Sequence, residues 1–347
     1  MIFKPGYEQE LSGYIHENEA LFRRFDGRSF LVSGAAGLIG SYLIDLLIQA
    51  HRELGIGVRV LACDRDGNLL EERFPDAFAD VVKRCVLDIC TGDLPEEPAD
   101  YVIHAASNTS PTDYATKPID TILTNMLGMN RLCEFAVRHG SKRFLQCSSV
   151  EAYGRNNGDT DAFTEGYSGF VDSNTLRAGY PSAKRCAEAL CNAYAVEHSG
   201  FDFVIARIAR IYGPAVLLTD TKAATQFILN AVRGEDIVLK SDGAQLYSWG
   251  YSGDCAMAML LLLLDGVNGQ AYNIADPEPC RLRDFADMAA AAGGKKVVFQ
   301  LPNETEKAGY SKITKATMDV AKLSALGWTV RIPLRDGIRR TVEYLKG

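Results

Sequence analysis

Tyr180 and Lys184 are the two residues of this chain whose types and spacing most clearly suggest chemistry. They begin a stretch in which apolar residues recur at helical intervals, so a separation of four places both side chains on one face of a helix. A neighbouring ammonium favours the ionised form of a phenol. Lys184 is therefore expected to lower the pKa of Tyr180 from its ordinary value of about 10. A phenolate of this kind can accept the proton of a substrate hydroxyl group.

A glycine-rich stretch at residues 34–40 supplies the second half of that chemistry. It follows an apolar run at 30–32 and precedes a helical pattern at 41–48, which predicts a strand, a tight turn and a helix. The first N–H groups of such a helix attract a pyrophosphate, and glycines let the backbone approach it. The stretch therefore predicts a dinucleotide that accepts hydride while Tyr180 takes the hydroxyl proton. The expected contacts in this turn are Gly34, Gly37, Leu38, Ile39 and Gly40.

Asp64 follows the next apolar run and favours NAD over NADP as the cofactor. A carboxylate at the end of the second strand can accept hydrogen bonds from the adenine ribose, and it would repel a 2′-phosphate. The adjacent Arg65 could instead attract such a phosphate, so NADP is the alternative. Asp88 and Ile89 follow the third predicted strand and are expected near the adenine.

Short apolar runs alternate with longer helical patterns from residue 29 onward, which is typical of a parallel sheet with helices on both faces. We therefore expect an α/β protein with a Rossmann-type, doubly wound parallel sheet and a smaller C-terminal α/β lobe. The predicted strands are 30–32, 58–63, 82–87, 101–104, 143–147 and 203–207. The predicted units are a helical extension at 1–28, a dinucleotide-binding domain at 29–213 that part of 238–273 rejoins, and a substrate-binding lobe at 214–347.

The composition argues against several classes of protein. The 347 residues are 47% hydrophobic and 23% charged, as expected for a globular enzyme, and the net charge of −7 does not suggest nucleic-acid binding. Nine cysteines without a Cys-x-x-Cys pair argue against a zinc site and a disulfide framework. The first residues lack the pattern of a secretion signal, and no apolar segment is long enough to span a bilayer. We expect a cytoplasmic protein without a metal, nucleic-acid or membrane partner.

Ser148 and Ser149, after the fifth predicted strand, are candidates for a third catalytic group. A hydroxyl there could hydrogen-bond the same substrate oxygen as Tyr180. Serine at a strand end also commonly serves a turn, so this assignment depends on its context.

Together these residues resemble the extended short-chain dehydrogenases, and more narrowly the NAD-dependent nucleotide-sugar epimerases, dehydratases and decarboxylases. The resemblance covers nearly the whole chain from residue 29. Its motifs are 34–40, His104-Ala105-Ala106, Asn125 with Gly128, 148–154, Tyr180 with Lys184, and 207–214.

This resemblance implies a tightly bound NAD that is reduced and reoxidised within each catalytic cycle. It also implies a nucleoside-diphosphate sugar in the smaller lobe, and a homodimer formed through helices near 119–139 and 180–199. The further cofactor contacts that it implies are Ala105, Ala106, Asn125, Tyr180 and Lys184. The implied substrate contacts are Ser107, Ser149, Glu151, Arg210 and Tyr247.

The segment Ser149-Val150-Glu151 discriminates among the reactions of those enzymes. Hexose 4,6-dehydratases place an aspartate at the middle position to protonate the leaving hydroxyl, and Val150 cannot donate a proton. UDP-glucuronate decarboxylases resemble the segment better, because they retain the hydroxyl and the glutamate. In their reaction, oxidation at C4 creates a β-keto acid that loses carbon dioxide. A 4-epimerase, which needs only Tyr180, Lys184 and Ser149, is the close alternative, with Glu151 then a solvated or capping carboxylate.

Two of the departures from the pattern of those enzymes concern substrate contacts. Arg210 replaces an asparagine in the stretch 207–214, and Tyr247 stands where an arginine commonly grips the substrate diphosphate. The pair is consistent either with a relocated phosphate contact or with a substrate that is not a standard UDP- or dTDP-sugar. A non-catalytic dinucleotide sensor is the alternative from another class, although such a protein has no need of Tyr180 and Lys184.

Overall fold

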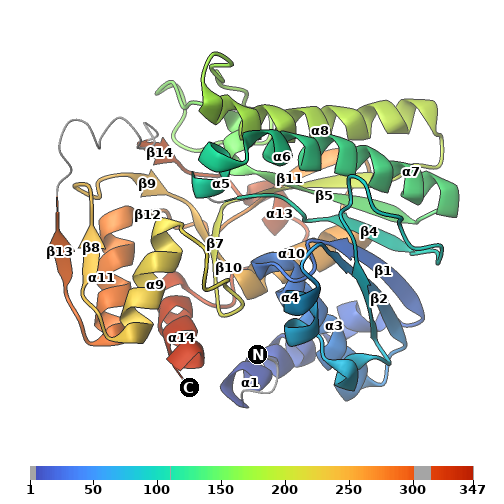
Figure 1. Cartoon of the computed structure of the whole chain (residues 1–347), viewed down its shortest axis with the longest axis horizontal. Helices are drawn as coiled ribbons and strands as arrows, with labels where there is room; N and C mark the ends of the chain where they lie inside the picture. The colour runs from blue at the N-terminus through green and yellow to red at the C-terminus, as the bar shows by residue number, and fades with distance from the viewer. Residues whose placement is uncertain (1–4, 110, 301–313, 347) are drawn as a thin grey trace.

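The computed structural model describes residues 5–109, 111–300 and 314–346, which form two lobes lying side by side (Figure 1). The larger lobe contains a seven-stranded sheet. Its strands are β1 (Arg28–Ser33), β2 (Val58–Asp64), β3 (Val82–Val86), β4 (Tyr101–His104), β5 (Arg143–Ser149), β6 (Phe203–Ile208) and β11 (Gln270–Ile274). They are all parallel, in the order β11-β6-β5-β4-β1-β2-β3. The predicted Rossmann-type sheet is confirmed.

The strand order reverses between β1 and β4. In open α/β sheets, ligands bind beyond the carboxyl ends of the strands at such a reversal. Among the strands that extend beyond their predicted ends, β2 includes Asp64 and β5 includes Ser148 and Ser149. All three side chains are therefore held by the sheet at the ligand-binding edge.

Helices cover both faces of the sheet and create two cores. One face carries α3 (Leu38–Leu54) and α10 (Ser252–Asp265), and the other carries α7 (Met129–His139) and α8 (Gly179–Glu197) (Figure 1). Strand residues alternate between the cores, so that Phe30 and Val32 belong to the first and Leu31 to the second. This arrangement matches the predicted doubly wound sheet.

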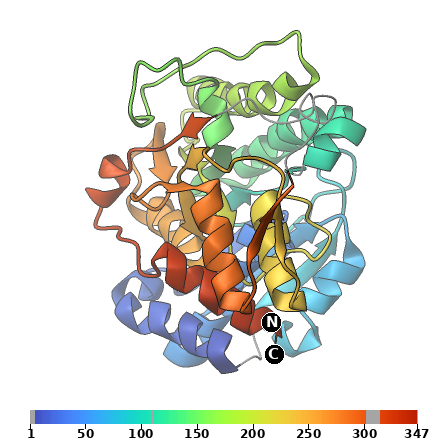
Figure 2. The same cartoon turned by 90° about the vertical axis from the view of Figure 1, so that its left-hand side faces the viewer.

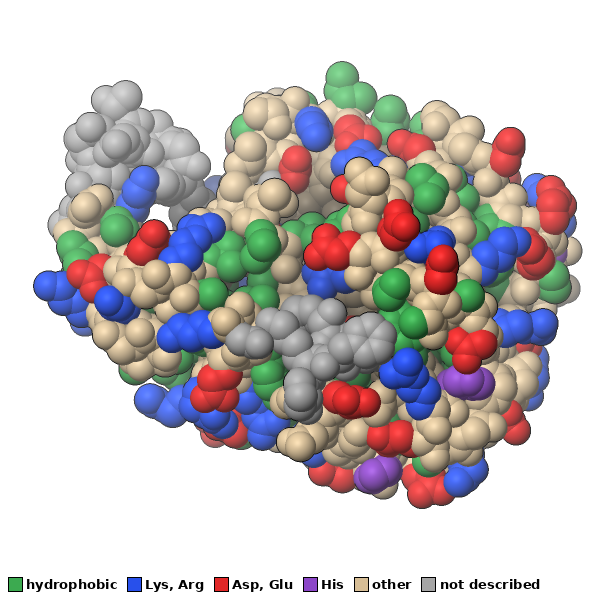
Figure 3. Space-filling view, turned by 60° about the horizontal axis from the view of Figure 1, so that its bottom comes forward, with side chains coloured by type: hydrophobic (Ala, Val, Ile, Leu, Met, Phe, Trp, Pro, Cys, Tyr) green, Lys and Arg blue, Asp and Glu red, His purple; other side chains and the backbone are tan. Residues whose placement is uncertain are grey.

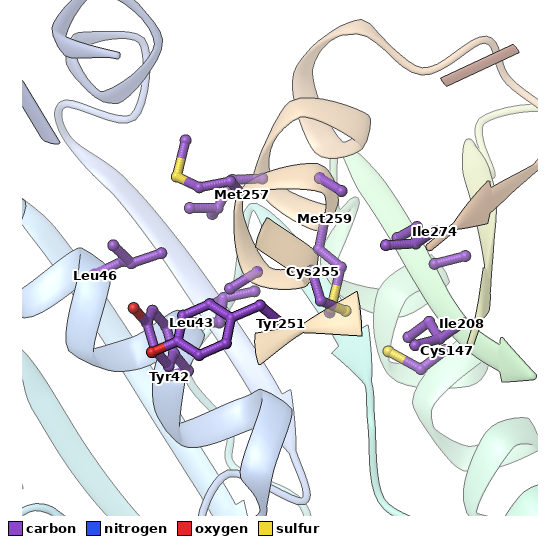
Figure 4. Packing of buried hydrophobic residues seen from close by; sticks show 14 of the residues in the cluster. Tyr42, Leu43, Leu46, Cys147, Ile208, Tyr251, Cys255, Met257, Met259 and Ile274 are labelled. Carbon is purple, nitrogen blue, oxygen red and sulfur yellow. The ribbon is translucent and has the colours of Figure 1, made fainter. Parts of the chain in front are cut away.

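The helix α10 is buried on nearly all sides, which explains its apolar run at residues 260–264. Figure 4 shows it between α3, which contributes Leu46, and the strands that carry Ile208 and Ile274. A helix that is apolar all round is expected where both of its sides are covered. No helix in the described part of the chain has the length and apolar character needed to cross a membrane.

The chain leaves the main sheet and returns to it. After β6 it enters the smaller lobe, comes back to form α10 and β11, and then crosses again. The helices of this lobe are α9 (Ala223–Arg233), α11 (Leu282–Gly293) and α14 (Leu334–Lys346), whereas α13 (Ala321–Ser324) packs against β11 of the main sheet. The strands of this lobe are β7 (Arg210–Tyr212), β8 (Ile237–Leu239), β9 (Leu246–Tyr247), β10 (Trp249–Tyr251), β12 (Cys280–Arg281), β13 (Val297–Phe299) and β14 (Lys315–Ala316). They form the small sheets β10-β7, β12-β9-β14 and β13-β8.

Short elements connect these units. They are α1 (Pro5–Glu17), α2 (Glu19–Arg23), α4 (Gly67–Arg73), α5 (Pro111–Thr116), α6 (Pro118–Leu123) and the single turns at Asp76–Phe78, Thr124–Gly128, Val150–Tyr153 and Leu176–Ala178. The first helix, α1, packs along α3. Figure 2 shows it lying close to α14, near the two ends of the chain.

A buried carboxylate, Glu10 of α1, joins both lobes. Its Oε1 accepts hydrogen bonds from Tyr42 and Tyr251, each at 2.6 Å. Its Oε2 accepts hydrogen bonds from Tyr344 at 3.1 Å and Arg340 at 3.2 Å. The donors come from α3, β10 and α14, so Glu10 connects the first helix to the last one and to the helix of the glycine turn.

Charged side chains of both signs are interspersed on the face drawn in Figure 3. On this face, the acidic excess in composition does not gather into one large patch.

Candidate active site

The three glycines of the turn between β1 and α3 have different tasks. Gly34 has a left-handed backbone (φ 69°), and a Cβ there would lie 2.7 Å from the Ala106 backbone. A Cβ on Gly40 would collide with the Gly34 carbonyl oxygen. Gly37 is the N-cap of α3, and it has no side chain to bond the first N–H groups of the helix. Two glycines therefore permit close packing, and the third leaves a helix N-terminus suited to a pyrophosphate.

A cleft of about 320 Å³ lies where the strand order reverses. The sequence-predicted residues that line it are Gly34, Gly37, Asp64, Asp88, Ile89, Ala105, Ala106 and Ser107. Leu38, Ile39 and Gly40 are not part of its lining, and Ser107 lies with the expected cofactor contacts rather than with the expected substrate contacts. The lining that sequence reasoning missed includes Asn108, Thr109, Asp113, Leu217, Thr219 and Asp220, most of which lie in connecting segments without a periodic pattern.

The surroundings of Asp64 favour NAD over NADP. The Asp64 carboxylate accepts a hydrogen bond from the Ala36 N–H at 3.2 Å, which fixes it beside the glycine turn. Arg65 donates to Asp120 and to Asn108, each at 2.9 Å. Because this guanidinium is already held by two acceptors, it is a poor partner for a 2′-phosphate.

The helix predicted near 119–139 contains an irregularity at Asn125. The elements α6 and α7 are joined by a π-helical turn at Thr124–Gly128. The Asn125 side chain donates to the Thr121 carbonyl oxygen at 2.8 Å and to Ser107 Oγ at 2.9 Å. Its buried Oδ1 has no hydrogen-bond partner among the described residues. Such turns often mark functional positions, and this one ties α6 to the cleft.

Tyr180 and Lys184 lie together on α8, with Lys184 Nζ 5.6 Å from the centre of the Tyr180 ring. Both side chains are buried. Lys184 donates a hydrogen bond to the Cys147 carbonyl oxygen at 2.7 Å. Burial lowers the pKa of Lys184 to about 8, so the amine is still mostly charged at neutral pH. The lysine is thus fixed by β5 at the end of the strand.

The pKa of Tyr180 is not below its ordinary value in the protein by itself, contrary to the expectation from Lys184 alone. Burial raises the pKa of Tyr180 above its ordinary value, and the negative charge of Glu151 raises it further. A hydrogen bond with Ser149 and the charge of Arg177 oppose this rise but do not overcome it. Desolvation of the phenolate therefore outweighs the neighbouring positive charges.

His104 is a buried residue of the site to which no role was assigned from sequence. Its Nδ1 is 2.9 Å from Ser33 Oγ, and its Nε2 has no hydrogen-bond partner among the described residues. Burial and the nearby charge of Lys184 lower the pKa of His104 to about 3, so the imidazole is neutral. The sequence signal that could have pointed to His104 is its place in one motif with Ala105 and Ala106.

The two serines at the end of β5 have separate partners. Ser148 donates to Glu188 at 2.5 Å, and Glu188 also forms an ion pair with Arg207 at 2.7 Å. Ser149 instead accepts a hydrogen bond from the Glu151 N–H at 3.2 Å, and it also hydrogen-bonds Tyr180. Ser149, rather than Ser148, therefore belongs to the group around Tyr180.

Glu151 is placed beside this group by the turn that follows β5. Its carboxylate accepts a hydrogen bond from Arg177 at 2.5 Å. The Arg177 guanidinium lies over the Tyr114 ring at 4.4 Å, and that ring is 5.0 Å from the ring of Tyr180. Arg177 and Tyr114 thus complete a compact group that sequence reasoning missed, because neither residue belongs to a recognisable motif.

The two departures noted in the sequence are in direct contact. The Arg210 guanidinium stacks over the Tyr247 ring, 3.7 Å from its centre. The strand β7 carries Arg210 and pairs with β10, which begins just after Tyr247. Of the predicted substrate contacts, Ser149, Glu151, Arg210 and Tyr247 lie near one another, as the electrostatic influence of Glu151 on Arg210 and Tyr247 also indicates.

The described residues fit a dinucleotide and offer no metal site. A helix N-terminus, a ribose-binding carboxylate and an apolar cleft floor at Ala105 and Ala106 occur in the order that NAD requires. No group of three or more His, Cys, Asp or Glu in the described ranges is positioned to hold a metal ion.

The comparison with known proteins agrees with this geometry. The sequence profile of the family described as "NAD dependent epimerase/dehydratase family" matches residues 30–275. The chain belongs to this family. It is 30% identical over 313 residues to UDP-glucuronic acid decarboxylase 6 of Arabidopsis thaliana, covering 89% of this chain and 86% of the relative. It is 28% identical over 325 residues to UDP-glucuronic acid decarboxylase 1 of Xenopus tropicalis, covering 92% and 73% respectively.

Solved structures of epimerases share the fold of this family member. An epimerase of Methanothermobacter thermautotrophicus superposes with a TM-score of 0.81 at 21% identity, covering 94% of each chain. UDP-glucuronic acid 4-epimerase of Bacillus cereus, solved with UDP-glucuronic acid and NAD, gives a TM-score of 0.75 at 21% identity, covering 92% of this chain and 99% of that one. As a member of this family, the chain is an NAD-dependent enzyme.

Proposed function

We propose that this enzyme decarboxylates UDP-glucuronate through transient oxidation at C4. The observation that carries the proposal is the group formed by Tyr180, Lys184, Ser149 and Glu151 at the end of β5, with Val150 buried between the serine and the glutamate. The curated relatives described above support decarboxylation. The buried Val150 offers no acid for the loss of a hydroxyl group, which argues against a 4,6-dehydratase.

The residues of this group have separate tasks in the proposed reaction. Tyr180 takes the proton of the C4 hydroxyl, and Ser149 hydrogen-bonds the same oxygen. Lys184 holds a positive charge beside the phenol and favours its ionisation. NAD, when bound, accepts the hydride from C4 and later returns it.

Proton balance follows from the chemistry of the keto acid. Oxidation at C4 makes the C5 carboxylate β to a ketone, so the C5–carboxylate bond breaks and its electron pair forms the enolate. C5 then gains a proton, which we assign to relay from solvent through Glu151 beside Arg177. Tyr180 returns its proton to the C4 oxygen as hydride returns to C4, and the product is a UDP-pentose with carbon dioxide.

The test is to supply UDP-glucuronate to the NAD-loaded enzyme and measure carbon dioxide and the nucleotide product. Tyr180→Phe is expected to reduce turnover at least a thousandfold while NAD remains bound. Tyr194→Phe, on the same helix but away from this group, is the matched control and should retain activity. Release of a uronate epimer without carbon dioxide would instead identify a 4-epimerase. Bound NAD that no sugar nucleotide reduces would point to a dinucleotide sensor.

We further infer a cytoplasmic homodimer with an NAD-binding unit at 29–213, which α10 and β11 rejoin, and a substrate unit in the rest of 214–347. Its support is an apolar surface on the two predicted dimer helices. The exposed side chains there include Ile119 (71% exposed), Leu127 (48%) and Val196 (87%). Nine unpaired cysteines fit a reducing compartment.

A further inference from the structure

Arg210 has a buried N–H group without an acceptor and forms no ion pair among the described residues, although Glu151 is near enough to act on its charge. Its Nη1 is buried and has no hydrogen-bond partner among them, and its guanidinium packs flat against Tyr247. Arg177, the other arginine of this region, is already paired with Glu151. A buried cation without a partner is costly, so this arrangement is suited to an anion that arrives with a ligand.

Strand register locates this cation relative to the reacting groups. Ser149 of β5 is aligned with Ile208 of β6 in the parallel sheet. Glu151 follows in the turn Val150–Tyr153, and Arg210 comes two residues after Ile208, so both lie just beyond the carboxyl ends of these two strands. Ser149 marks the C4 oxygen through its hydrogen bond with Tyr180. The charge of Glu151 acts on both Tyr180 and Arg210, so Arg210 lies on the side of the site that holds the reacting groups, where C5 and its carboxylate adjoin C4.

We propose that Arg210 binds the C6 carboxylate of the hexuronate and selects acidic sugars over neutral ones. This inference rests on the proposed function and deepens it. A planar guanidinium can hold both carboxylate oxygens at once, and stacking on Tyr247 fixes its plane. The diphosphate is the other anionic part of the substrate, but a contact to it would be shared by neutral and acidic UDP-sugars. A contact to the carboxylate should therefore affect only acidic sugars, whereas a contact to the diphosphate should affect both kinds of UDP-sugar.

The experiment measures the affinity of the NAD-loaded enzyme for UDP-glucuronate and for UDP-glucose by calorimetry. Arg210→Gln is expected to weaken UDP-glucuronate binding at least thirtyfold and to change UDP-glucose binding less than threefold. Arg210→Lys keeps the charge but not the planar fork, and it should weaken UDP-glucuronate binding about fivefold. It also serves as the test if the glutamine variant does not fold.

A second variant tests whether a guanidinium at a neighbouring position can replace the one of Arg210. Adding Tyr247→Arg to the Arg210→Gln protein places a guanidinium on the other side of the same contact. Because an arginine at position 247 commonly grips the diphosphate in the enzymes that the sequence resembles, this change should strengthen the binding of both ligands alike and should not restore the preference for UDP-glucuronate. Arg233→Gln, at the far end of α9, is the control for loss of an arginine and should leave both affinities unchanged.

Two results would overturn the assignment: an equal loss of both ligands, which places Arg210 at the diphosphate, or no loss of either. Failure of the proposed function looks different. A wild-type enzyme that binds UDP-glucuronate through Arg210 but releases no carbon dioxide would refute decarboxylation and leave the carboxylate contact intact. A decarboxylase whose affinities ignore Arg210 would refute only the contact.

Discussion

The buried carboxylate of Glu10 offers a quantitative test of how the lobes are held together. In Glu10→Ala the hydroxyls of Tyr42 and Tyr251 lose their acceptor while they remain inside the protein. Each orphaned buried donor costs about 1–3 kcal/mol. Arg340 and Tyr344 are partly exposed and can turn to water. We therefore expect the free energy of unfolding to fall by about 2–6 kcal/mol.

Glu10→Gln retains one carbonyl oxygen, so its cost should be smaller, about 1–3 kcal/mol. Gln9→Ala, at an exposed position of the same helix, should change the free energy of unfolding by less than about 0.5 kcal/mol. The assay is urea unfolding followed by circular dichroism and tryptophan fluorescence, with coincident transitions required for the comparison.

The decisive comparison repeats Glu10→Ala in a protein that already carries Tyr42→Phe and Tyr251→Phe. Without those hydroxyls there are no orphaned donors from them, so the cost of removing Glu10 should fall by at least half. An equal cost in both backgrounds would refute the explanation by unsatisfied donors. A cost below about 1 kcal/mol in the wild-type background would refute it as well.

Three further predictions concern pH and assembly. Burial lowers the pKa of Lys184 to about 8, so the charged amine is lost above that pH and kcat should fall tenfold per pH unit there. Lys184→Arg should move this fall in kcat to higher pH. A flat pH profile of kcat up to pH 10 would contradict the assignment. Burial raises the pKa of Asp45 to about 6, so folding binds a proton between about pH 4 and 6 and the wild type loses stability as pH rises through that window. Asp45→Asn keeps an acceptor for Tyr7 and should gain up to about 3 kcal/mol relative to wild type from pH 4 to pH 7; a pH-independent difference in unfolding would contradict this. Leu127→Glu should convert the dimer to monomers in sedimentation, whereas the exposed control Val267→Glu should not; a dimeric Leu127→Glu protein would exclude this interface.

Much of the fold was predictable because it depends on local patterns. The six predicted strands are present, since short apolar runs between helical patterns have few other packing solutions. The glycine turn and the pair Tyr180 and Lys184 were also recognisable, because their spacing is set by one turn or one helix. The seventh strand, β11, was less clear, because it comes after an excursion through the other lobe.

The parts of the site that could not be predicted depend on contacts between distant segments. Arg210 and Tyr247 lie far apart in sequence, and nothing periodic indicates that they stack. The pairing of Glu151 with Arg177 depends on a loop whose course has no sequence signature. The effect of burial on Tyr180 was also inaccessible, because desolvation depends on how many atoms surround the phenol rather than on one neighbour.

The repeated crossing of the chain between lobes limits how they can come apart. A break introduced near residue 214 would leave β6 without its neighbour β11, which is made only later in the chain. The first fragment would expose an unsatisfied sheet edge and the apolar side of α3 that α10 normally covers. The first fragment would therefore lack part of its own core and sheet until the second fragment supplied α10 and β11.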